Sequence, residues 1–197
     1  HVRYNDDGRI SHATIKGKDI DFNYNSLGQM SRVGDYTYKY DNYGNRIEKR
    51  NGYNDLLVTE YKYARGGQLI QAGSIQYSYN QNGVLCKKIN NGSTAKFLLD
   101  GNKILGVDIY GGNSYALRFM YDLTGLNFVS YNDVDYEYVL DSQGNVIMLI
   151  DSLTDRIVAR YEYDIFGNCT VYNADNEIDT DPTSIGNINP FRWKGFY

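Results

Sequence analysis

The chain has 197 residues, and its 20 Lys and Arg against 24 Asp and Glu give a formal net charge of −4 at pH 7. Because the basic residues are scattered, they form no stripe that could follow a phosphate backbone, and no nucleic-acid partner is expected. The longest run of aliphatic residues and Met is Val146 to Ile150, whereas a membrane-spanning helix needs roughly 18 apolar residues or more. No membrane span is predicted.

A phrase of two aromatics one residue apart, a polar turn and a glycine recurs along the whole chain. Its clearest copies are Tyr38 to Asn45 (YKYDNYGN) and Tyr161 to Asn168 (YEYDIFGN). The phrase glycines are spaced by about 20 residues on average, a period typical of repeat arrays. We expect a structural role in turns for all of them: Gly8, Gly28, Gly44, Gly67, Gly83, Gly101, Gly125, Gly144 and Gly167.

The phrase predicts a β-hairpin. Side chains at i and i+2 lie on the same face of a strand, so Tyr38 and Tyr40 share one face while Lys39 takes the other. Asp or Asn at the first turn position can accept backbone hydrogen bonds, and Gly can adopt the left-handed conformation that a type I turn with a bulge requires. The repeat aromatics with this expected structural role are Tyr38, Tyr40, Tyr61, Tyr63, Tyr77, Tyr79, Tyr136, Tyr138, Tyr161 and Tyr163.

In chain order, the hairpin array is predicted over residues 1–172. Residues 97–150 are more aliphatic, so we expect burial there, and Val146 to Ile150 is typical of a strand covered on both faces. Residues 173–189 predict an acidic irregular loop, and residues 190–197 a separate terminal motif. The array would hold up to eighteen strands, and sheets beyond about ten strands curl, split or close. The predicted fold is all-β: antiparallel β-hairpins in a strongly curved or spiralling sheet.

The phrase YxYDxxGN resembles the tyrosine-aspartate repeat of the Rhs and YD-repeat proteins. Further matches are Phe97 to Ile104 (FLLDGNKI), Tyr136 to Leu149 (YEYVLDSQGNVIML) and Asn187 to Tyr197 (NINPFRWKGFY), the last of which is similar to the opening of the Rhs-associated core. The resemblance covers essentially the whole chain. Single YD phrases are degenerate, but the ordered set that ends in NPFRWKGFY is specific.

The resemblance implies a segment of the β-strand spiral that these proteins wind into a closed shell. In polymorphic toxins and insecticidal toxin complexes the shell encloses a variable C-terminal toxin, and related repeats occur in the extracellular region of teneurins. The implied partners are the rest of the parent shell and its C-terminal effector, and the implied location is secreted or at the bacterial cell surface. The family's DPxxGR self-cleavage motif is not matched, because Asp181-Pro182 has the wrong spacing and no Arg.

The inventory of reactive side chains argues against an enzyme. Asp41, Asp122 and Asp164 recur beside turns along an array instead of converging, and turn chemistry explains them. His1 and His12 are the only histidines, so a nucleophile with a histidine base would depend on one of these two. We therefore expect no catalytic residue and no cofactor.

No metal site is expected either. The alternating acidic residues between Asn173 and Asp181 have Ile178 where a calcium loop requires Gly, which favours a solvated loop. Cys86 and Cys169 stand too far apart for a paired ligand motif, and they are either half-buried strand residues or a bridged pair.

The sequence is consistent with two functions. The first is a non-enzymatic structural shell segment of a toxin or cell-surface protein, which encloses or presents a C-terminal effector. The second is a carbohydrate-binding or adhesive module, because sugars stack on exposed aromatic faces such as the Tyr rows. Whether that face is open or covered discriminates between them. Open strand edges also predict edge-to-edge self-association.

Overall fold

The computed structural model describes residues 1–15, 17–164 and 167–195. Two positions of the YEYDIFGN turn, Ile165 and Phe166, and the last two of the terminal motif, Phe196 and Tyr197, lie outside the described residues. Contacts divide the chain into two compact units, unit 1 (His1–Gly92) and unit 2 (Ser93–Tyr197).

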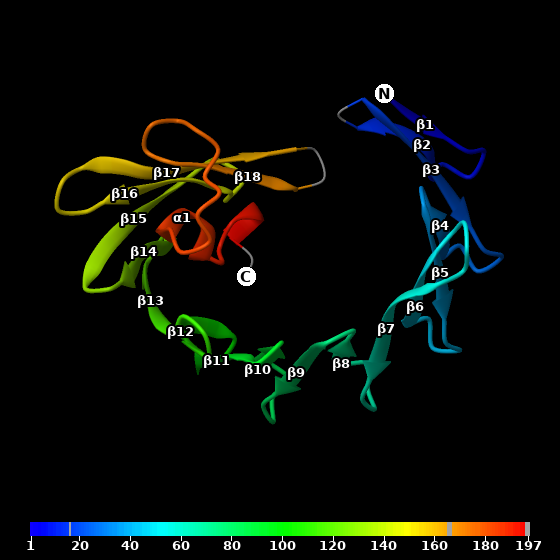
Figure 1. The fold of residues 1–197 in the computed structure, drawn as a ribbon, viewed down its shortest axis with the longest axis horizontal. Coiled ribbons are helices and arrows are strands. Elements are labelled where there is room, and N and C mark those ends of the chain that lie inside the picture. The colour runs from blue at the N-terminus through cyan, green and yellow to red at the C-terminus, as the bar shows by residue number, and fades with distance from the viewer. Residues whose placement is uncertain (16, 165–166, 196–197) are drawn as a thin grey trace. The chain divides into compact units, whose positions relative to one another are not determined.

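Unit 1 is a meander in which each strand pairs antiparallel with the next one along the chain. This follows from its short connections, since antiparallel strands can be joined by tight turns whereas parallel strands need long crossovers. Its strands, blue to green in Figure 1, are β1 (Val2–Tyr4), β2 (Ile10–Ile15), β3 (Lys18–Tyr24), β4 (Met30–Val33), β5 (Tyr36–Tyr40), β6 (Arg46–Asn51), β7 (Leu57–Tyr63), β8 (Leu69–Ala72), β9 (Ile75–Tyr79) and β10 (Leu85–Asn90).

Unit 2 continues the same pattern of consecutive antiparallel pairs. It holds β11 (Ser93–Asp100), β12 (Lys103–Tyr110), β13 (Tyr115–Asp122), β14 (Gly125–Tyr131), β15 (Val134–Leu140), β16 (Val146–Asp151), β17 (Arg156–Tyr163) and β18 (Cys169–Tyr172). Two short helical turns follow, α1 (Ile185–Ile188) and η1 (Trp193–Gly195). The prediction of an all-β array of antiparallel hairpins is therefore confirmed.

The described hydrophobic core lies almost entirely in unit 2. In unit 1 Ala13 is the one residue of the described part that is buried, whereas in unit 2 buried apolar side chains come from every strand. This confirms the burial predicted for residues 97–150 and extends it to β17 and β18. The unit 2 strand residues are Ala95, Phe97, Val107, Leu117, Phe119, Val129, Tyr138, Val146, Leu149, Ala159, Tyr161 and Val171.

The prediction that β16 is covered on both faces is wrong. Val146 and Leu149 are fully buried, but Ile147, Met148 and Ile150 are only partly buried. Leu149 pairs with Tyr138, one of the residues that contact the C-terminal part of the chain, whereas Met148 pairs with Val139 on the opposite face. The apolar run therefore supplies one packed face and one partly exposed face.

The chain between β18 and α1 is held by local polar contacts. An isolated bridge joins Tyr172 to Ile178, and the Ser184 hydroxyl donates to Asp179 Oδ2 at 2.6 Å while it accepts from the backbone N–H of Asn187 at 3.2 Å. Ser184 is thus the N-cap of α1. A helical turn forms in this way within the span for which the sequence predicts an irregular loop.

Candidate functional site: the tyrosine face and the C-terminal segment

Eight of the nine phrase glycines lie in turns with left-handed backbone, whereas Gly125 is the first residue of β14. All nine have positive φ, from 58° at Gly101 to 131° at Gly125. At Gly44 the Asp41 N–H donates to Asn45 O at 2.9 Å and the Gly44 N–H donates to Asp41 O at 3.1 Å, the arrangement of a three-residue hairpin loop with a bulge. Gly101 and Gly125 differ, because Asp100 pairs with Lys103 and Asp122 with Gly125 across two-residue loops.

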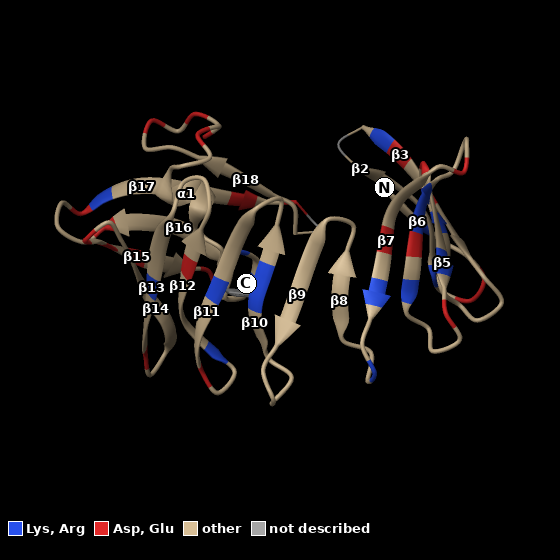
Figure 2. Cartoon of the chain, turned by 60° about the horizontal axis from the view of Figure 1, so that its bottom comes forward, with Lys and Arg blue, Asp and Glu red and all other residues tan. Residues whose placement is uncertain are grey.

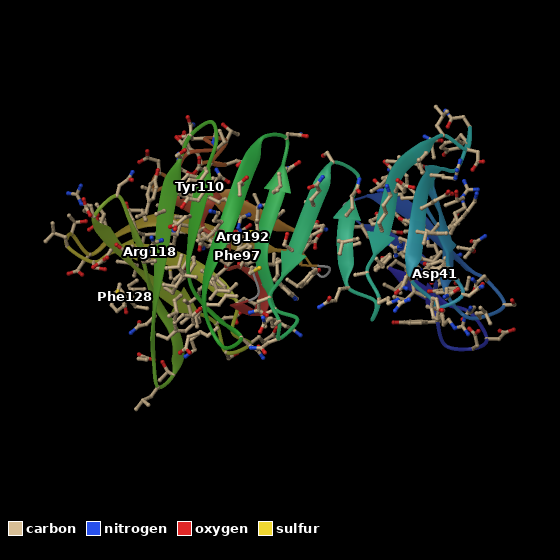
Figure 3. The ribbon with its side chains drawn as sticks, turned by 90° about the horizontal axis from the view of Figure 1, so that it is seen from below. Asp41, Phe97, Tyr110, Arg118, Phe128 and Arg192 are labelled. Atoms are coloured by element: carbon tan, nitrogen blue, oxygen red, sulfur yellow. The ribbon has the colours of Figure 1, made fainter. Side chains whose placement is uncertain are left out.

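The aspartates of the phrase act within these turns. Asp41 Oδ1 accepts from the backbone N–H groups of Tyr43 and Asn45, and its Oδ2 accepts from the Asn45 amide at 2.9 Å. These bonds, that of the Asn45 side chain above all, lower the pKa of the Asp41 carboxyl. Asp41 lies at the end of the β5–β6 hairpin (Figure 3). Its lone pairs are directed at its own loop, which is turn chemistry.

In six of the described hairpins the aromatic nearer the turn, which we call the end position, joins the hairpin to the strand before it. Its hydroxyl donates to a backbone carbonyl at the start of the paired preceding strand. A Phe cannot make this bond, which accounts for Tyr at these sites. The bonds are Tyr24 to Ile10 O (2.9 Å), Tyr40 to Met30 O (2.7 Å), Tyr63 to Arg46 O (3.0 Å), Tyr79 to Leu69 O (2.8 Å), Tyr121 to Ile104 O (2.8 Å) and Tyr163 to Val146 O (2.6 Å).

The aromatic two residues earlier, the inner position, has a different role in unit 2. It contacts the C-terminal segment, which we define as residues 185–195. Phe119 packs edge-to-face on Phe191 with ring centroids 4.7 Å apart, and the Tyr161 hydroxyl donates to Gly186 O at 3.0 Å. In Figure 1 α1 and the red end of the chain lie against the strands of unit 2. The repeat aromatics are therefore divided between linking strands and holding this segment.

Asn189 is the centre of the contact. Its side chain is 1% exposed, yet its amide is bonded on both atoms. Oδ1 accepts from the Tyr138 hydroxyl at 2.6 Å, while Nδ2 donates to the Tyr161 hydroxyl at 3.2 Å and to Phe191 O at 2.8 Å. Burial raises the pKa of both tyrosines, so the hydroxyls stay neutral. A buried polar group satisfied in this way favours one docked position of the segment.

Close packing and one cation complete the docking of the segment. A Cβ on Gly186 would come within 2.9 Å of Ala159 Cβ and 3.0 Å of Val171 Cγ1, so only glycine lets α1 approach the sheet this closely. The Arg192 guanidinium donates to Asn187 O at 2.9 Å and to Gly186 O at 3.3 Å. It thus satisfies carbonyls that a helix C-terminus leaves unpaired.

The edge of the segment is bonded to the turn before β16. The Lys194 N–H donates to Asn145 Oδ1 at 2.9 Å, and the Val146 N–H donates to Arg192 O at 3.0 Å. The Trp193 ring packs against Tyr163 at 5.4 Å between centroids. The motif NINPFRWKGFY was visible in the sequence, but the burial of Asn189 was not predicted from it. The signal available was an Asn directly before Pro-Phe.

Unit 1 has a tyrosine face and an opposite face that differ in charge. The strands of unit 1 contain four carboxylates, and all of them lie on the opposite face because their positions alternate with those of tyrosine-face residues. They are Asp19, Asp21, Glu48 and Glu60. Three cations of this face are paired: Lys62 with Glu60, and Arg50 and Lys39 with Glu48, with Arg50 Nε 2.6 Å and Lys39 Nζ 3.2 Å from Glu48 Oε2. The bonds to Arg50 and Lys39 lower the pKa of Glu48 to about 2. Figure 2 shows both signs of charge along β6 and β7.

The strands of unit 1 place cations but no carboxylate on the tyrosine face. The Arg46 guanidinium carbon lies 4.3 Å from the centre of the Tyr38 ring, and Lys49 Nζ lies 3.7 Å from that of Tyr36. Lys88 pairs with Tyr77 across β9 and β10 and so shares its face. None of these three cations has an ion-pair partner among the described residues.

The acidic, histidine and cysteine side chains of the described part of the chain are not gathered as a metal centre. No group of three or more His, Cys, Asp or Glu there could hold a metal ion. The His12 ring is bonded to Asp21 at 2.8 Å, and Cys86 and Cys169 are both free and half-buried. None of the described helices is long and apolar enough to span a membrane.

Comparisons with known proteins agree with this architecture. The family model of the teneurin YD-shell matches residues 1–177. Among curated proteins, the tRNA3(Ser)-specific nuclease WapA of Bacillus spizizenii is 25% identical over 99% of this chain, and the tRNA nuclease WapA of Bacillus subtilis is 26% identical over 99%. The chain spans 8% of the length of each of these two relatives.

Solved structures similar to this chain include TcdB2-TccC3-Cdc42 and TcdB2-TccC3. The TcdB2-TccC3-Cdc42 crystal structure has a TM-score of 0.47 and 14% identity, covering 88% of this chain and 12% of that one. The TcdB2-TccC3 crystal structure has a TM-score of 0.46 and 12% identity, covering 89% and 11%. On the match of the family model, and as the resemblance to YD-repeat proteins predicts, the chain belongs to the teneurin YD-shell family.

Proposed function

We propose that this chain is a non-enzymatic wall segment in the shell of a larger secreted or cell-surface toxin, and that the complete shell encloses a C-terminal effector. Its partners are the rest of the parent shell and that effector. The observation that carries the proposal is the construction of the sheet: consecutive hairpins, six of which are bonded to the strand before them by an end-position tyrosine such as Tyr40, Tyr63 or Tyr79. Such bonds resist separation of neighbouring strands, which is what a wall requires.

Membership in the YD-shell family and the names of the curated relatives support a toxin context. Those relatives are named as nucleases, and the chain matches only a small part of each. We assign any such activity to a part outside this segment, because the phrase carboxylates are engaged in their own turns. The chain alone should therefore leave tRNA intact. Cleavage of tRNA by the purified chain would overturn the non-enzymatic assignment.

The containment proposal is tested on the parent protein by limited proteolysis. The effector should be cut far more slowly in the parent than when it is expressed alone. A parent with Tyr40→Phe, Tyr63→Phe and Tyr79→Phe loses three bonds of about 0.5–1.5 kcal/mol each and should protect it less well. Tyr43→Phe is the matched control, since that ring is 92% exposed. Equal cutting of the enclosed and the isolated effector would refute containment.

Carbohydrate binding is the second candidate function. Asp41, Tyr43, Tyr63 and Arg65 line a hollow of about 670 Å³ between two successive phrase turns, and the exposed Tyr43 ring offers a surface on which a sugar could stack. In unit 2, however, inner-position aromatics are covered by the C-terminal segment. Glycan-array binding that Tyr43→Ala abolishes would favour this function, and a blank array would remove it.

A further inference from the structure

The inner-position aromatics of unit 1 correspond to residues of unit 2 that hold polypeptide. Tyr38, Tyr61 and Tyr77 stand two residues before an end-position tyrosine, as Tyr161 stands before Tyr163. The Tyr161 hydroxyl is bonded to the backbone of the C-terminal segment. The hydroxyls of the three unit 1 tyrosines have no hydrogen-bond partner in the described part of the chain. The inner-position aromatics are thus covered by polypeptide in unit 2, whereas in unit 1 their hydroxyls are hydrogen-bond donors without an acceptor in the described part of the chain.

The charges on the tyrosine face of unit 1 indicate which kind of ligand it would bind. Arg46, Lys49 and Lys88 lie on this face, and the four strand carboxylates of the unit lie on the other. Arg46 Nε is buried and has no hydrogen-bond partner, and an unpaired buried donor costs about 1–3 kcal/mol. A carboxylate brought to this face would pair with the Arg46 guanidinium and neutralise cations that have no ion-pair partner among the described residues.

We propose that the tyrosine face of unit 1 is a docking surface for an acidic polypeptide segment in extended conformation. Carboxylates of the segment pair with Arg46, Lys49 and Lys88, while its backbone carbonyls accept from Tyr38 and its neighbours in the row. The chain has a net charge of −4, so an acidic partner is attracted only where cations are grouped locally, as they are on this face. A polypeptide is favoured over other anions because polypeptide occupies the corresponding aromatics of unit 2.

Binding is measured on the full chain by fluorescence anisotropy at low salt. The probe is a short labelled peptide of Glu, Gly and Phe, and its counterpart carries Lys in place of Glu. The acidic peptide should bind and the basic one should not. Arg46→Gln with Lys49→Gln and Lys88→Gln should weaken binding about tenfold or more. The matched control removes one Arg and two Lys from the opposite face, at Arg50, Lys39 and Lys62, and should leave binding unchanged.

Two further parts of the experiment test whether the partner is a polypeptide. Tyr38→Phe, Tyr61→Phe and Tyr77→Phe remove hydroxyls that the folded chain does not use, so urea stability should hold while peptide affinity falls. Heparin and a single-stranded oligonucleotide are added as competitors. Displacement of the peptide by either at equal charge would overturn the polypeptide assignment, and equal loss in both triple-cation variants would overturn the location.

The inference deepens the proposed containment, because an enclosed effector is one source of an acidic segment. The two can fail separately. Protection of the effector without peptide binding would reject this surface and keep the shell, whereas peptide binding without protection would reject containment and keep the surface.

Discussion

Replacing Asn189 by Leu should detach the C-terminal segment from the sheet. Leu has a similar shape, so the change removes hydrogen bonds without opening a large cavity. The Tyr138 hydroxyl, in a side chain 5% exposed, loses its acceptor at 2.6 Å, which costs about 1–3 kcal/mol. The lost bonds to the Tyr161 hydroxyl and to Phe191 O add about 1 kcal/mol each. We expect a total loss of about 3–5 kcal/mol in the free energy of unfolding.

A double-mutant cycle separates the hydrogen bond from general damage. Tyr138→Phe alone should cost about 0.5–1.5 kcal/mol, but in the Asn189→Leu background it removes the stranded hydroxyl and should restore about 1–3 kcal/mol. Tyr121→Phe is the control, because its hydroxyl donates to Ile104 O and not to Asn189. Its effect should be additive with that of Asn189→Leu.

The assay is urea unfolding followed by circular dichroism and by fluorescence. The sole tryptophan, Trp193, lies in the segment against Tyr163, so its emission reports docking directly. In Asn189→Leu the emission should shift to the red at lower urea than in the parent chain. If the Tyr138 and Asn189 changes are additive within about 0.5 kcal/mol, the proposed role of their bond is refuted.

Three further predictions concern the same region. Gly186→Val should cost about 2 kcal/mol or more by overpacking against Ala159, and an unchanged urea midpoint would contradict the close approach. Gly167→Ala should be more costly than Gly144→Ala, because both have left-handed φ, 83° and 82°, but only at Gly167 would the new Cβ meet Trp193, at 3.2 Å; equal midpoints would contradict this. Burial raises the pKa of Tyr161 above its usual value, so its contribution to stability is complete below about pH 10 and is lost as the pH rises beyond it. Red-shifted Trp193 emission should appear above that pH, and an unchanged spectrum would contradict the burial of a neutral hydroxyl.

The hairpins could be read from the sequence because their causes are local. The turn at Asp41 is closed by bonds to Tyr43 and Asn45, two and four residues away, and the faces of β5 follow from side-chain alternation alone. The array, its turn glycines and the absence of long helices were therefore predictable. The burial of β16 on one face was not, because a run of apolar residues does not say which face will be covered.

The end-position tyrosines mark the limit of local reasoning. Their presence is visible in the phrase, but their acceptors lie between 10 and 17 residues earlier in the chain. Register between hairpins decides which carbonyl each hydroxyl meets. The sequence phrase gives only the strand face of each ring, whereas the structure gives each of these hydroxyls a backbone acceptor.

By itself the sequence determined the period, the strand faces and the turns, since these depend on neighbours within a few residues. Tertiary structure alone decided which tyrosines hold another part of the chain. Tyr38 and Tyr161 occupy the same place in the same phrase, yet Tyr161 is 3% exposed beneath Gly186, 25 residues later, and Tyr38 is only half-buried. Tyr138 finds Asn189 across 51 residues. No local sequence pattern encodes such a contact, because it depends on the path of the chain after the last strand. That path is determined by packing against a sheet that must already have formed.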